Sequence, residues 1–295
     1  MSPSQRILLT GRNGQLGTEC SLVIPSDCEV IAVDYPEFDL ADADVLARTV
    51  REIQPDMLLH AAAWTAVDKA EEHEAEAHAI NATATDVLAS CMAELGGRMA
   101  FVSTDYVFSG EGVVPWREQD PVAPINAYGR TKLAGEQAVA AHLGDRGHVV
   151  RTSWLYGRRG ANFVRTMLNL MSSGRALKVV EDQVGSPTWA GGLAKALFAL
   201  AQASEAPSTL HFTDQGIVSW FDFAVAIRAC GLENGLALED SSVAPCPGSE
   251  YPTPAARPAW SPMHFSDAWH ELGIPPSDWK QTLHAALPLL LQSQA

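Results

Sequence analysis

The stretch that decides the fold is "RILLTGRNGQLG", Arg6 to Gly17, in which an aliphatic run leads directly into a glycine-rich loop. Gly11, Gly14 and Gly17 recur every three residues, ahead of a helical pattern. Because glycine lacks a Cβ atom, such a loop turns tightly and lets the backbone approach a pyrophosphate, whose charge is met by free N–H groups at the helix N-terminus. The spacing alone is a weak signal, since many strand–turn–helix connections need flexible residues. The glycine spacing indicates a phosphate-binding loop only if the neighbouring sequence forms alternating strands and helices.

The rest of the first half supplies those surroundings, because short aliphatic runs alternate with longer helical patterns. "RILLT" precedes "GQLGTECSLVI", "VIAVD" precedes "ADVLARTVREI", and "MLLHAAA" precedes "EAEAHAINATATDVLASCMAEL". "MAFVSTDYVF" and "HVVRTSWLYG" add two more strand-like runs, separated by a helical pattern over residues 127–143. This is the rhythm of a parallel sheet covered by helices. We therefore predict an α/β fold, a Rossmann-type doubly wound parallel sheet, with a smaller C-terminal substrate-binding lobe.

The rhythm loosens after residue 157, which suggests two parts. Residues 1–157 are expected to form an NAD(P)-binding Rossmann core, and residues 158–295 mainly a substrate-binding lobe, with some segments returning to the core sheet. A helix over residues 190–203 and the strand "TLHFT" are candidates for that return. Residues 234–262 are rich in Pro, Ser and Gly, which fits ordered loops of the lobe or, on composition alone, a disordered segment.

Composition excludes several classes of partner. Lys and Arg number 20 against 35 Asp and Glu, a formal charge of −15, so a nucleic-acid partner is not expected. The five cysteines are scattered, without a CxxC pair or a His cluster at metal-ligand spacing, which predicts reduced thiols and no metal centre. No apolar run approaches the roughly 20 residues of a spanning helix. We expect a cytoplasmic protein with no membrane partner.

Two residues near the glycine-rich loop bear on the choice of cofactor. Asp34 ends the second strand-like run, where a carboxylate can accept hydrogen bonds from the adenine ribose hydroxyls and favour NADH. Arg12, inside the loop, can instead pair with a 2′-phosphate and favour NADPH, or be an ordinary solvated arginine. The two residues point in opposite directions, so the sequence leaves NADH and NADPH both open.

The stretch "INAYGRTKLAGE" places Tyr128 and Lys132 at i and i+4, on one face of a helix. A free tyrosine has a pKa of about 10, and a nearby ammonium favours the phenolate electrostatically. Thr104, in "VSTDYVF", follows a strand at the edge where open parallel sheets bind ligands. Tyrosine and threonine hydroxyls aimed at one carbonyl would stabilise a developing alkoxide. The pair alone arises readily by chance, but with the loop and the threonine it predicts catalysis.

Seven blocks together resemble the extended short-chain dehydrogenase/reductase family, and within it the dTDP-4-dehydrorhamnose reductases. They are "GRNGQLG" at 11–17, "HAAAWTAVDKAE" at 60–71, "STDYVFSG" at 103–110, "YGRTKLAGE" at 128–136, "RTSWLYG" at 151–157, "DQVGSPT" at 182–188 and "YPTPAARPAWS" at 251–261. The first and fourth blocks are shared by the whole superfamily, and the later ones are the more specific. The resemblance covers nearly the whole chain.

The resemblance implies reduction of the 4-keto group of dTDP-4-dehydro-L-rhamnose to dTDP-L-rhamnose by NADPH or NADH. It implies that Tyr128 is the proton donor, Lys132 its partner and Thr104 a hydroxyl that orients the carbonyl. Substrate contacts are expected from Thr104, Asp105 and Trp154, and from Arg257, whose planar guanidinium suits a pyrophosphate. The expected cofactor residues are Gly11, Arg12, Asn13, Gly14, Gln15, Leu16, Gly17, Asp34, Asp39, Leu40, Ala61, Ala62, Ala63, Thr65, Tyr128 and Lys132.

One departure from the family concerns Mg²⁺. Some of these reductases dimerise through carboxylates and Mg²⁺, with a glutamate shortly after "PT" of the "DQxGxPT" block, where this chain has Gly191 and Gly192. Glu19 is a possible single ligand, although a lone helix glutamate is normally solvated, and a hard cation needs several oxygens. We expect a monomer or a homodimer, with Mg²⁺ doubtful. A 4-epimerase and a non-catalytic regulatory subunit of the same fold remain the alternatives to the reductase.

Overall fold

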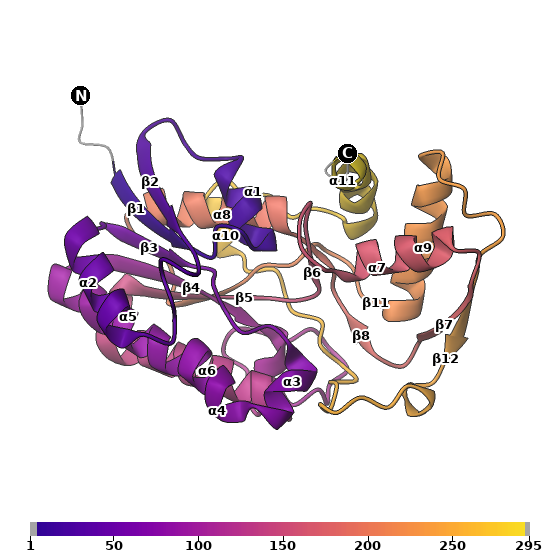
Figure 1. Ribbon diagram of the computed structural model, residues 1–295, viewed down its shortest axis with the longest axis horizontal. Coiled ribbons are helices and arrows are strands. Elements are labelled where there is room, and N and C mark those ends of the chain that lie inside the picture. The colour runs from indigo at the N-terminus through magenta and orange to yellow at the C-terminus, as the bar shows by residue number, and fades with distance from the viewer. Residues whose placement is uncertain (1–4, 293–295) are drawn as a thin grey trace.

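The computed structural model describes residues 5–292 and has a six-stranded parallel sheet at its centre (Figure 1). The strand order is β10-β5-β4-β3-β1-β2, and every pairing between neighbours is parallel. The strands are β1 (Gln5–Thr10), β2 (Cys28–Val33), β3 (Met57–His60), β4 (Arg98–Thr104), β5 (Gly147–Thr152) and β10 (Thr209–His211). The predicted parallel sheet is confirmed.

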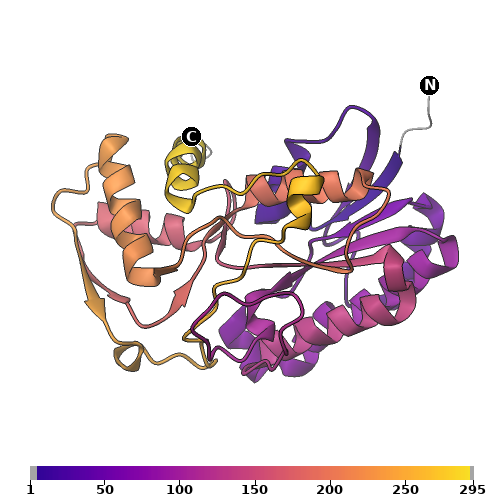
Figure 2. The ribbon, with the colours of Figure 1, turned by 180° about the vertical axis from the view of Figure 1, so that it is seen from behind.

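Helices cover both faces of this sheet, as Figures 1 and 2 show from opposite sides. One face carries α2 (Ala43–Ile53), α3 (Val67–Glu72), α4 (Glu74–His78), α5 (Ala84–Leu95) and α6 (Ala127–Leu143), and the other carries α1 (Gln15–Ser21), α8 (Ala190–Gln202) and α10 (Ala268–Glu271). The aliphatic strands are buried because each face has its own apolar core. Leu8 and Leu58 pack towards α2 and α5, whereas Ile7 and Leu9 pack towards α8. This alternation is what a sheet covered on both sides requires.

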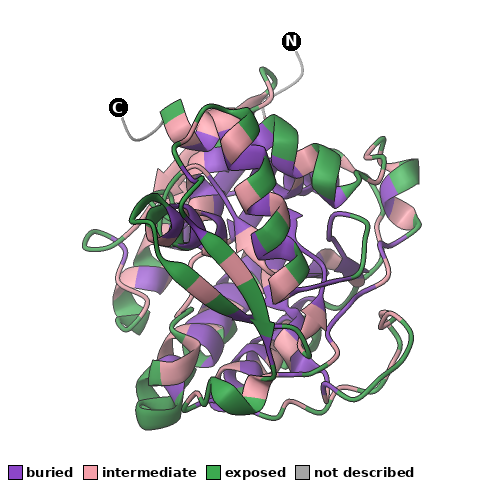
Figure 3. Ribbon diagram, turned by 90° about the vertical axis from the view of Figure 1, so that its right-hand side faces the viewer, coloured by how far each residue is buried: buried purple, intermediate pink, exposed green. Residues whose placement is uncertain are grey.

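A second apolar core lies beyond the carboxyl ends of the strands and belongs to a lobe. It is built on α7 (Phe163–Ser172), α9 (Trp220–Glu233) and α11 (Trp279–Gln292), with the parallel pair β7 (Ala176–Val180) and β12 (Ser242–Cys246). Figure 3 shows that the outer residues of this strand pair are exposed. Short pairs join the lobe to the core, namely β6 (Leu155–Tyr156) with β9 (Thr188–Trp189) and β8 (Val184–Gly185) with β11 (Val218–Ser219).

Two elements of the second half of the chain return to the main sheet, and one segment differs from the sequence prediction. β10 pairs with β5 at the edge of the main sheet, and α8 covers that sheet. Residues 234–262, which we expected to lack regular structure, contain β12 and a short turn η4 (Gly248–Glu250). The strand forms because β7 offers a partner edge far away in sequence. No helix among the described residues combines the length and apolar character that a membrane crossing requires.

Candidate active site

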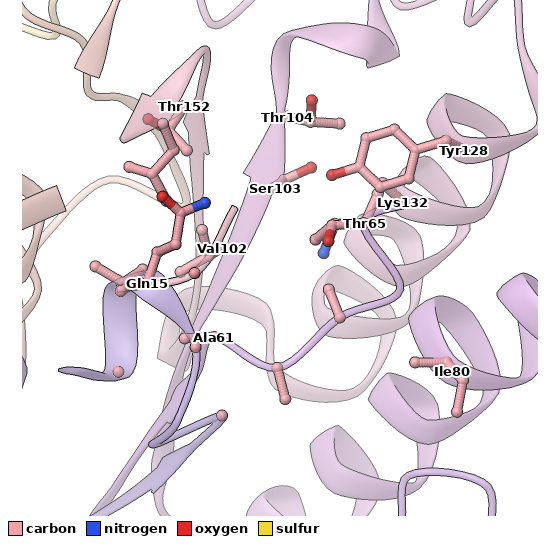
Figure 4. A pocket seen from close by; sticks show the side chains of 18 of the residues that line it. Gln15, Ala61, Thr65, Ile80, Val102, Ser103, Thr104, Tyr128, Lys132 and Thr152 are labelled. Carbon is pink, nitrogen blue, oxygen red and sulfur yellow. The ribbon is translucent and has the colours of Figure 1, made fainter. Parts of the chain in front are cut away.

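A cleft of about 710 Å³ lies where the carboxyl ends of the strands face the lobe. Its walls come from the glycine-rich loop, the ends of β3, β4 and β5, the first turns of α6 and the loop after β6. In Figure 4, Ser103, Thr104, Tyr128, Lys132 and Thr65 gather on one side of the cleft, and Gln15 and Thr152 lie on the other. This is the edge at which open parallel sheets bind their ligands.

The glycine-rich loop has the geometry of a phosphate cradle. Gly11 adopts a left-handed φ of +80°, and a Cβ there would lie 2.9 Å from the Ala62 backbone nitrogen. A Cβ on Gly17 would lie 2.0 Å from the Gly11 carbonyl oxygen, so α1 packs against the loop only because Gly17 has no side chain. Gly14 caps α1 without a side-chain hydrogen bond, which leaves N–H groups at the helix start for an anion. These features fit the pyrophosphate of a dinucleotide.

Asp34 and Arg12 are placed differently with respect to the cleft. Asp34 lines it, and its carboxylate accepts hydrogen bonds from the Asn13 nitrogen at 2.7 Å and the Tyr35 nitrogen at 2.8 Å. Arg12 does not line it: one guanidinium nitrogen donates to the Ala32 carbonyl at 3.3 Å, and another lies 3.7 Å from the Glu37 carboxylate. Asn13 also lies off the cleft, and its backbone serves to fix Asp34.

The remaining expected cofactor residues border the cleft. The segment after β3 runs along it, held by the Ala62 nitrogen, which donates to the Thr10 hydroxyl at 3.2 Å. That hydroxyl also bonds the buried His60 ring at 2.7 Å, so His60 helps to fix this segment. The cleft-lining members of the set are Gly11, Gly14, Gln15, Leu16, Gly17, Asp34, Asp39, Leu40, Ala61, Ala62, Ala63, Thr65, Tyr128 and Lys132.

The tyrosine and threonine meet at the end of β4. Asn126 caps α6 by accepting from the Gly129 nitrogen at 2.8 Å, which places Tyr128 in the first turn. A hydrogen bond from Thr104 lowers the pKa of Tyr128, but burial in the cleft, followed by the charge of Asp105, raises it more, to a value above the ordinary 10. The expected shift towards the phenolate is therefore wrong for this state. A phenol with a raised pKa keeps its proton and can donate it.

Lys132 is buried one turn further along α6. Its Nζ lies 3.8 Å from the centroid of the Phe101 ring, a cation–π distance. Burial lowers the pKa of Lys132 from 10.5 to about 7, against an opposing effect of Glu136. The side chain thus lies near the point where it gains or loses its proton at neutral pH.

Three of the four expected substrate residues line the cleft, namely Thr104, Asp105 and Trp154. Asp105 is buried, accepts from the Thr104 hydroxyl at 2.9 Å, and has a pKa that burial raises to about 6. Trp154 has a left-handed φ of +46° and stacks on Trp220 with ring centroids 3.5 Å apart. A Cβ on Gly185 would lie 2.5 Å from the Trp154 indole, so this glycine leaves room for the ring. Trp154 is thus held in place at the lining of the cleft.

Arg257 lies outside the cleft lining. Its Nη2 donates to the Asp68 carboxylate at 2.7 Å, and the other Asp68 oxygen accepts from the Ala255 nitrogen at 3.2 Å. These bonds fasten the segment after η4 to α3. The charge of Arg257 still reaches Tyr106, a cleft residue, where it lowers a pKa that burial raises.

Several cleft residues were missed by the sequence analysis. Tyr106 packs edge-on against Tyr128, with ring centroids 5.7 Å apart. Serine and threonine at the ends of β4 and β5 were detectable, because they stand at strand ends beside residues that we did select. The loop after β6 gave no such signal. The missed lining residues are Tyr35, Phe38, Val67, Ile80, Val102, Ser103, Tyr106, Thr152, Ser153, Leu155, Gly160 and Ala161.

Glu19 is buried, contrary to our expectation of a solvated side chain. Its carboxylate accepts from the Arg158 backbone nitrogen at 3.0 Å and lies 3.5 Å from the Arg158 guanidinium, which anchors the loop after β6 on α1. Gly191 packs so closely on Trp189 that a Cβ would lie 2.3 Å from the indole nitrogen. Among the described residues, no group of three or more His, Cys, Asp or Glu could hold a metal ion.

The chain is similar along its whole length to proteins of one family. The family model described as "RmlD substrate binding domain" matches residues 5–291. A dTDP-4-dehydrorhamnose reductase of Burkholderia thailandensis is 40% identical over 285 residues, covering 93% of this chain and 95% of that protein. The crystal structure of such a reductase from Clostridium acetobutylicum has a TM-score of 0.89 at 39% identity, covering 97% of this chain and all of that one.

A third similar protein carries a ligand. It is a dTDP-4-dehydrorhamnose reductase of Bacillus anthracis, whose structure in complex with NADP has a TM-score of 0.89 at 33% identity and covers 97% of this chain and 99% of that one. The family match and the identities extend over both the core and the lobe. This chain therefore belongs to the family described as the RmlD substrate binding domain, which confirms the resemblance to the dTDP-4-dehydrorhamnose reductases.

Proposed function

We propose that this chain is an NAD(P)H-dependent ketoreductase that converts dTDP-4-dehydro-L-rhamnose to dTDP-L-rhamnose. The observation that carries the proposal is the meeting of Thr104, Tyr128 and Lys132 at one wall of a cleft whose other end is a glycine-rich phosphate cradle. The names of the similar proteins support the substrate. In the part of the chain that the structure describes, the cleft is large enough to hold both a nicotinamide and a sugar.

In this proposal a bound reduced nicotinamide supplies the hydride, and the chain supplies the proton. Tyr128 donates from its phenolic oxygen to the carbonyl oxygen of the sugar, because its raised pKa keeps it protonated until the alkoxide forms. The Thr104 hydroxyl, beside Tyr128, stabilises the same oxygen. Lys132 holds the ribose next to the nicotinamide with its buried amine. The glycine-rich loop and α1 hold the cofactor pyrophosphate.

The substrate side of the proposal uses Asp105, Trp154 and Arg257. Asp105 accepts from sugar hydroxyls, and Trp154 packs against the sugar ring. Arg257 contributes to the substrate pyrophosphate through Nη1, which is buried without a hydrogen-bond partner while Nη2 holds Asp68. Asp105 and Trp154 lie at the ends of β4 and β5, and Arg257 comes from the C-terminal half of the chain. We propose that residues 158–295 are mainly the substrate-binding part and that residues 1–157 bind the cofactor and share in the substrate site.

Both NADH and NADPH are proposed cofactors, with NADH bound more tightly. Asp34 lines the cleft where the adenine ribose would lie, and a 2′-phosphate would meet its carboxylate. Arg12, the cation that would offset this repulsion, lies against Glu37. We propose a metal-free protein, monomeric or homodimeric.

The test follows the absorbance of NADH and NADPH, in separate assays, with dTDP-4-dehydro-L-rhamnose generated in situ by the upstream dehydratase and epimerase. Oxidation that depends on the sugar, with dTDP-L-rhamnose as product, is the expected result. Cofactor binding without oxidation would contradict the reductase and favour the regulatory-subunit alternative. Cofactor retained through gel filtration would favour an epimerase, because a reductase must exchange its cofactor at every turnover.

A further inference from the structure

Behind the catalytic wall lies a buried ion pair that the proposed mechanism does not use. Glu136, one turn beyond Lys132 on α6, is 6% exposed, and Arg151 on β5 is 5% exposed. Arg151 donates from Nε to one Glu136 oxygen at 3.0 Å and from Nη2 to the other at 2.7 Å. Such a bidentate pair fixes both groups in direction as well as distance.

Further contacts hold this pair rigidly and connect it to the cleft. Ser103 lines the cleft, and its hydroxyl donates to Glu136 Oε1 at 2.5 Å. The Arg151 guanidinium lies over the Phe108 ring, 5.1 Å from its centroid, and Nη1 donates to the Glu118 carbonyl at 3.4 Å. A buried ion pair of this kind is weak evidence for stability, since desolvation offsets much of the attraction between its charges. Its placement beside Lys132 therefore calls for a second reason.

The position of Lys132 supplies that reason. Its amine is buried, and no salt bridge among the described residues includes it. At i+4 on the same helix, Glu136 is the acidic group whose charge favours the protonated form of Lys132. Arg151 holds the two oxygens of Glu136 from the side of β5, so the charge cannot swing away.

We propose that Glu136 is a positioning residue: fixed by Arg151 and Ser103, it supplies the negative charge that keeps the Lys132 side chain an ammonium inside the cleft. The inference rests on the proposed function, because Lys132 is the residue assigned to the cofactor ribose. An ammonium donates three hydrogen bonds and attracts the anionic cofactor, whereas the neutral amine loses that charge.

Other titratable groups around Lys132 do not replace Glu136. His60, on β3, is close enough for the charge of Lys132 to act on it. Burial, followed by that positive charge, lowers the pKa of His60 to about 3, so its ring is neutral. Asp105, in the short turn η2 (Asp105–Val107), acts on Tyr128. Three acidic side chains of the helices packed on α6 bond other α6 groups: Glu71 accepts from the Ala127 nitrogen, Glu74 from Arg130, and Asp86 pairs with His142. Asp68, on α3, is held by Arg257.

The direct test is the titration of Lys132 itself. The chain has five lysines, so a sample labelled with ¹³C at lysine Cε gives a short set of signals, in which Lys132→Met identifies that of Lys132. Glu136→Gln removes the charge and keeps the shape, and we expect the midpoint of the Lys132 signal to fall by about one pH unit. Glu19→Gln is the matched control, since it neutralises another buried glutamate and should leave the midpoint unchanged.

A second variant separates charge from structure, because Glu136→Gln leaves Arg151 buried without its partner and is destabilising. Glu136→Gln with Arg151→Gln removes both charges and should recover much of the thermal stability. Because the double variant also removes the positive charge of Arg151, the deciding comparison is Glu136→Gln alone at a temperature where that variant is folded. If Glu136 acts on Lys132, the midpoint of Glu136→Gln lies below that of the unmodified chain; if the pair is only structural, the two midpoints are equal and the proposal is overturned. The titration of Lys132 is measured without the sugar substrate, so its outcome and the outcome of the ketoreductase assay are separate results.

Discussion

On the wall of the cleft formed by β4 and α6, the core wall, chemistry-bearing residues are close in sequence and fixed by backbone geometry. Thr104 ends a strand, and Tyr128 and Lys132 stand on successive turns of one capped helix. On the opposite side, the lobe wall, Trp154 is held by packing against Trp220 and Gly185, which come from distant segments. The comparison teaches that the core wall fixes the direction of hydroxyl and amine groups, while the lobe wall fixes a shape.

The largest effect is expected on the core wall. Tyr128→Phe removes the proton donor and should lower kcat by about 10²–10⁴-fold, the range typical of general acid catalysis. NADH affinity, measured by fluorescence, should stay within about threefold, because the ring and its contact with Tyr106 are kept. Turnover close to that of the unmodified chain would show that Tyr128 is not the acid. Tyr106→Phe, which alters a neighbouring cleft tyrosine, is the matched control.

The second effect is on stability and comes from the lobe side. Asp214 follows β10, is 2% exposed, and accepts from the Trp189 nitrogen at 3.0 Å. Burial, with a smaller effect of Asp278, raises its pKa from 3.8 to about 7. The pKa of Asp214 is higher in the folded chain than in the unfolded chain, so the folded chain binds a proton more tightly at this site. The contribution of Asp214 to stability is therefore fully present below about pH 4 and is lost as the pH rises through about 7.

Asp214→Asn keeps the acceptor for Trp189 and cannot ionise, so it should stabilise the protein at pH 8 by a few kcal/mol and change little at pH 4. Thermal unfolding at both pH values measures this. Asp145→Asn, at an exposed position, should leave both melting temperatures where they were. An Asp214→Asn variant that melts lower at pH 8 would show that the carboxylate is needed in its charged form. The lobe side would then depend on a fixed polar group, as the core wall does.

The contrast between the walls also explains what the sequence could predict. The helix over residues 127–143 was predicted with the bounds that the structure has, because a helical period is a local signal. The strand-end position of Thr104 followed from the same kind of pattern. A strand such as β12 was not predicted: "SVAPC" is short and contains a proline, and it becomes a strand only where β7 pairs with it.

Single side chains show the same limit. Glu19 reads as a solvated helix residue, yet its partner Arg158 is 139 residues away, and only the folded chain buries the two together. The bond between Asp68 and Arg257 spans 189 residues, so the placing of Arg257 off the cleft had no local signal. The loop contacts of Arg12 with Glu37 depend on the turn after β2. Long-range packing, which no period encodes, decided each of these positions.

A third prediction concerns Trp154 and the shape of the lobe wall. Trp154→Ala should raise KM for the nucleotide sugar roughly tenfold, the worth of one aromatic contact, and change kcat little. Trp154→Phe keeps a ring and should stay within about threefold. Initial rates over a range of sugar concentrations separate the two constants. A fall in kcat with an unchanged KM would place Trp154 with the core wall and remove the distinction between the walls.

The smallest effect is expected at the cofactor end of the core wall. Glu37 and Arg12 are both largely exposed, and their charged atoms lie 3.7 Å apart, a pair worth under about 1 kcal/mol. Glu37→Gln releases Arg12 towards a 2′-phosphate and removes a carboxylate that repels it, so NADPH should bind about threefold more tightly while NADH changes little. Glu29→Gln is matched, since Glu29 pairs with Arg6 at 3.1 Å on the exposed side of β2. Equal changes for both cofactors would mean that Arg12 does not reach the phosphate, and Asp34 alone would then set the preference.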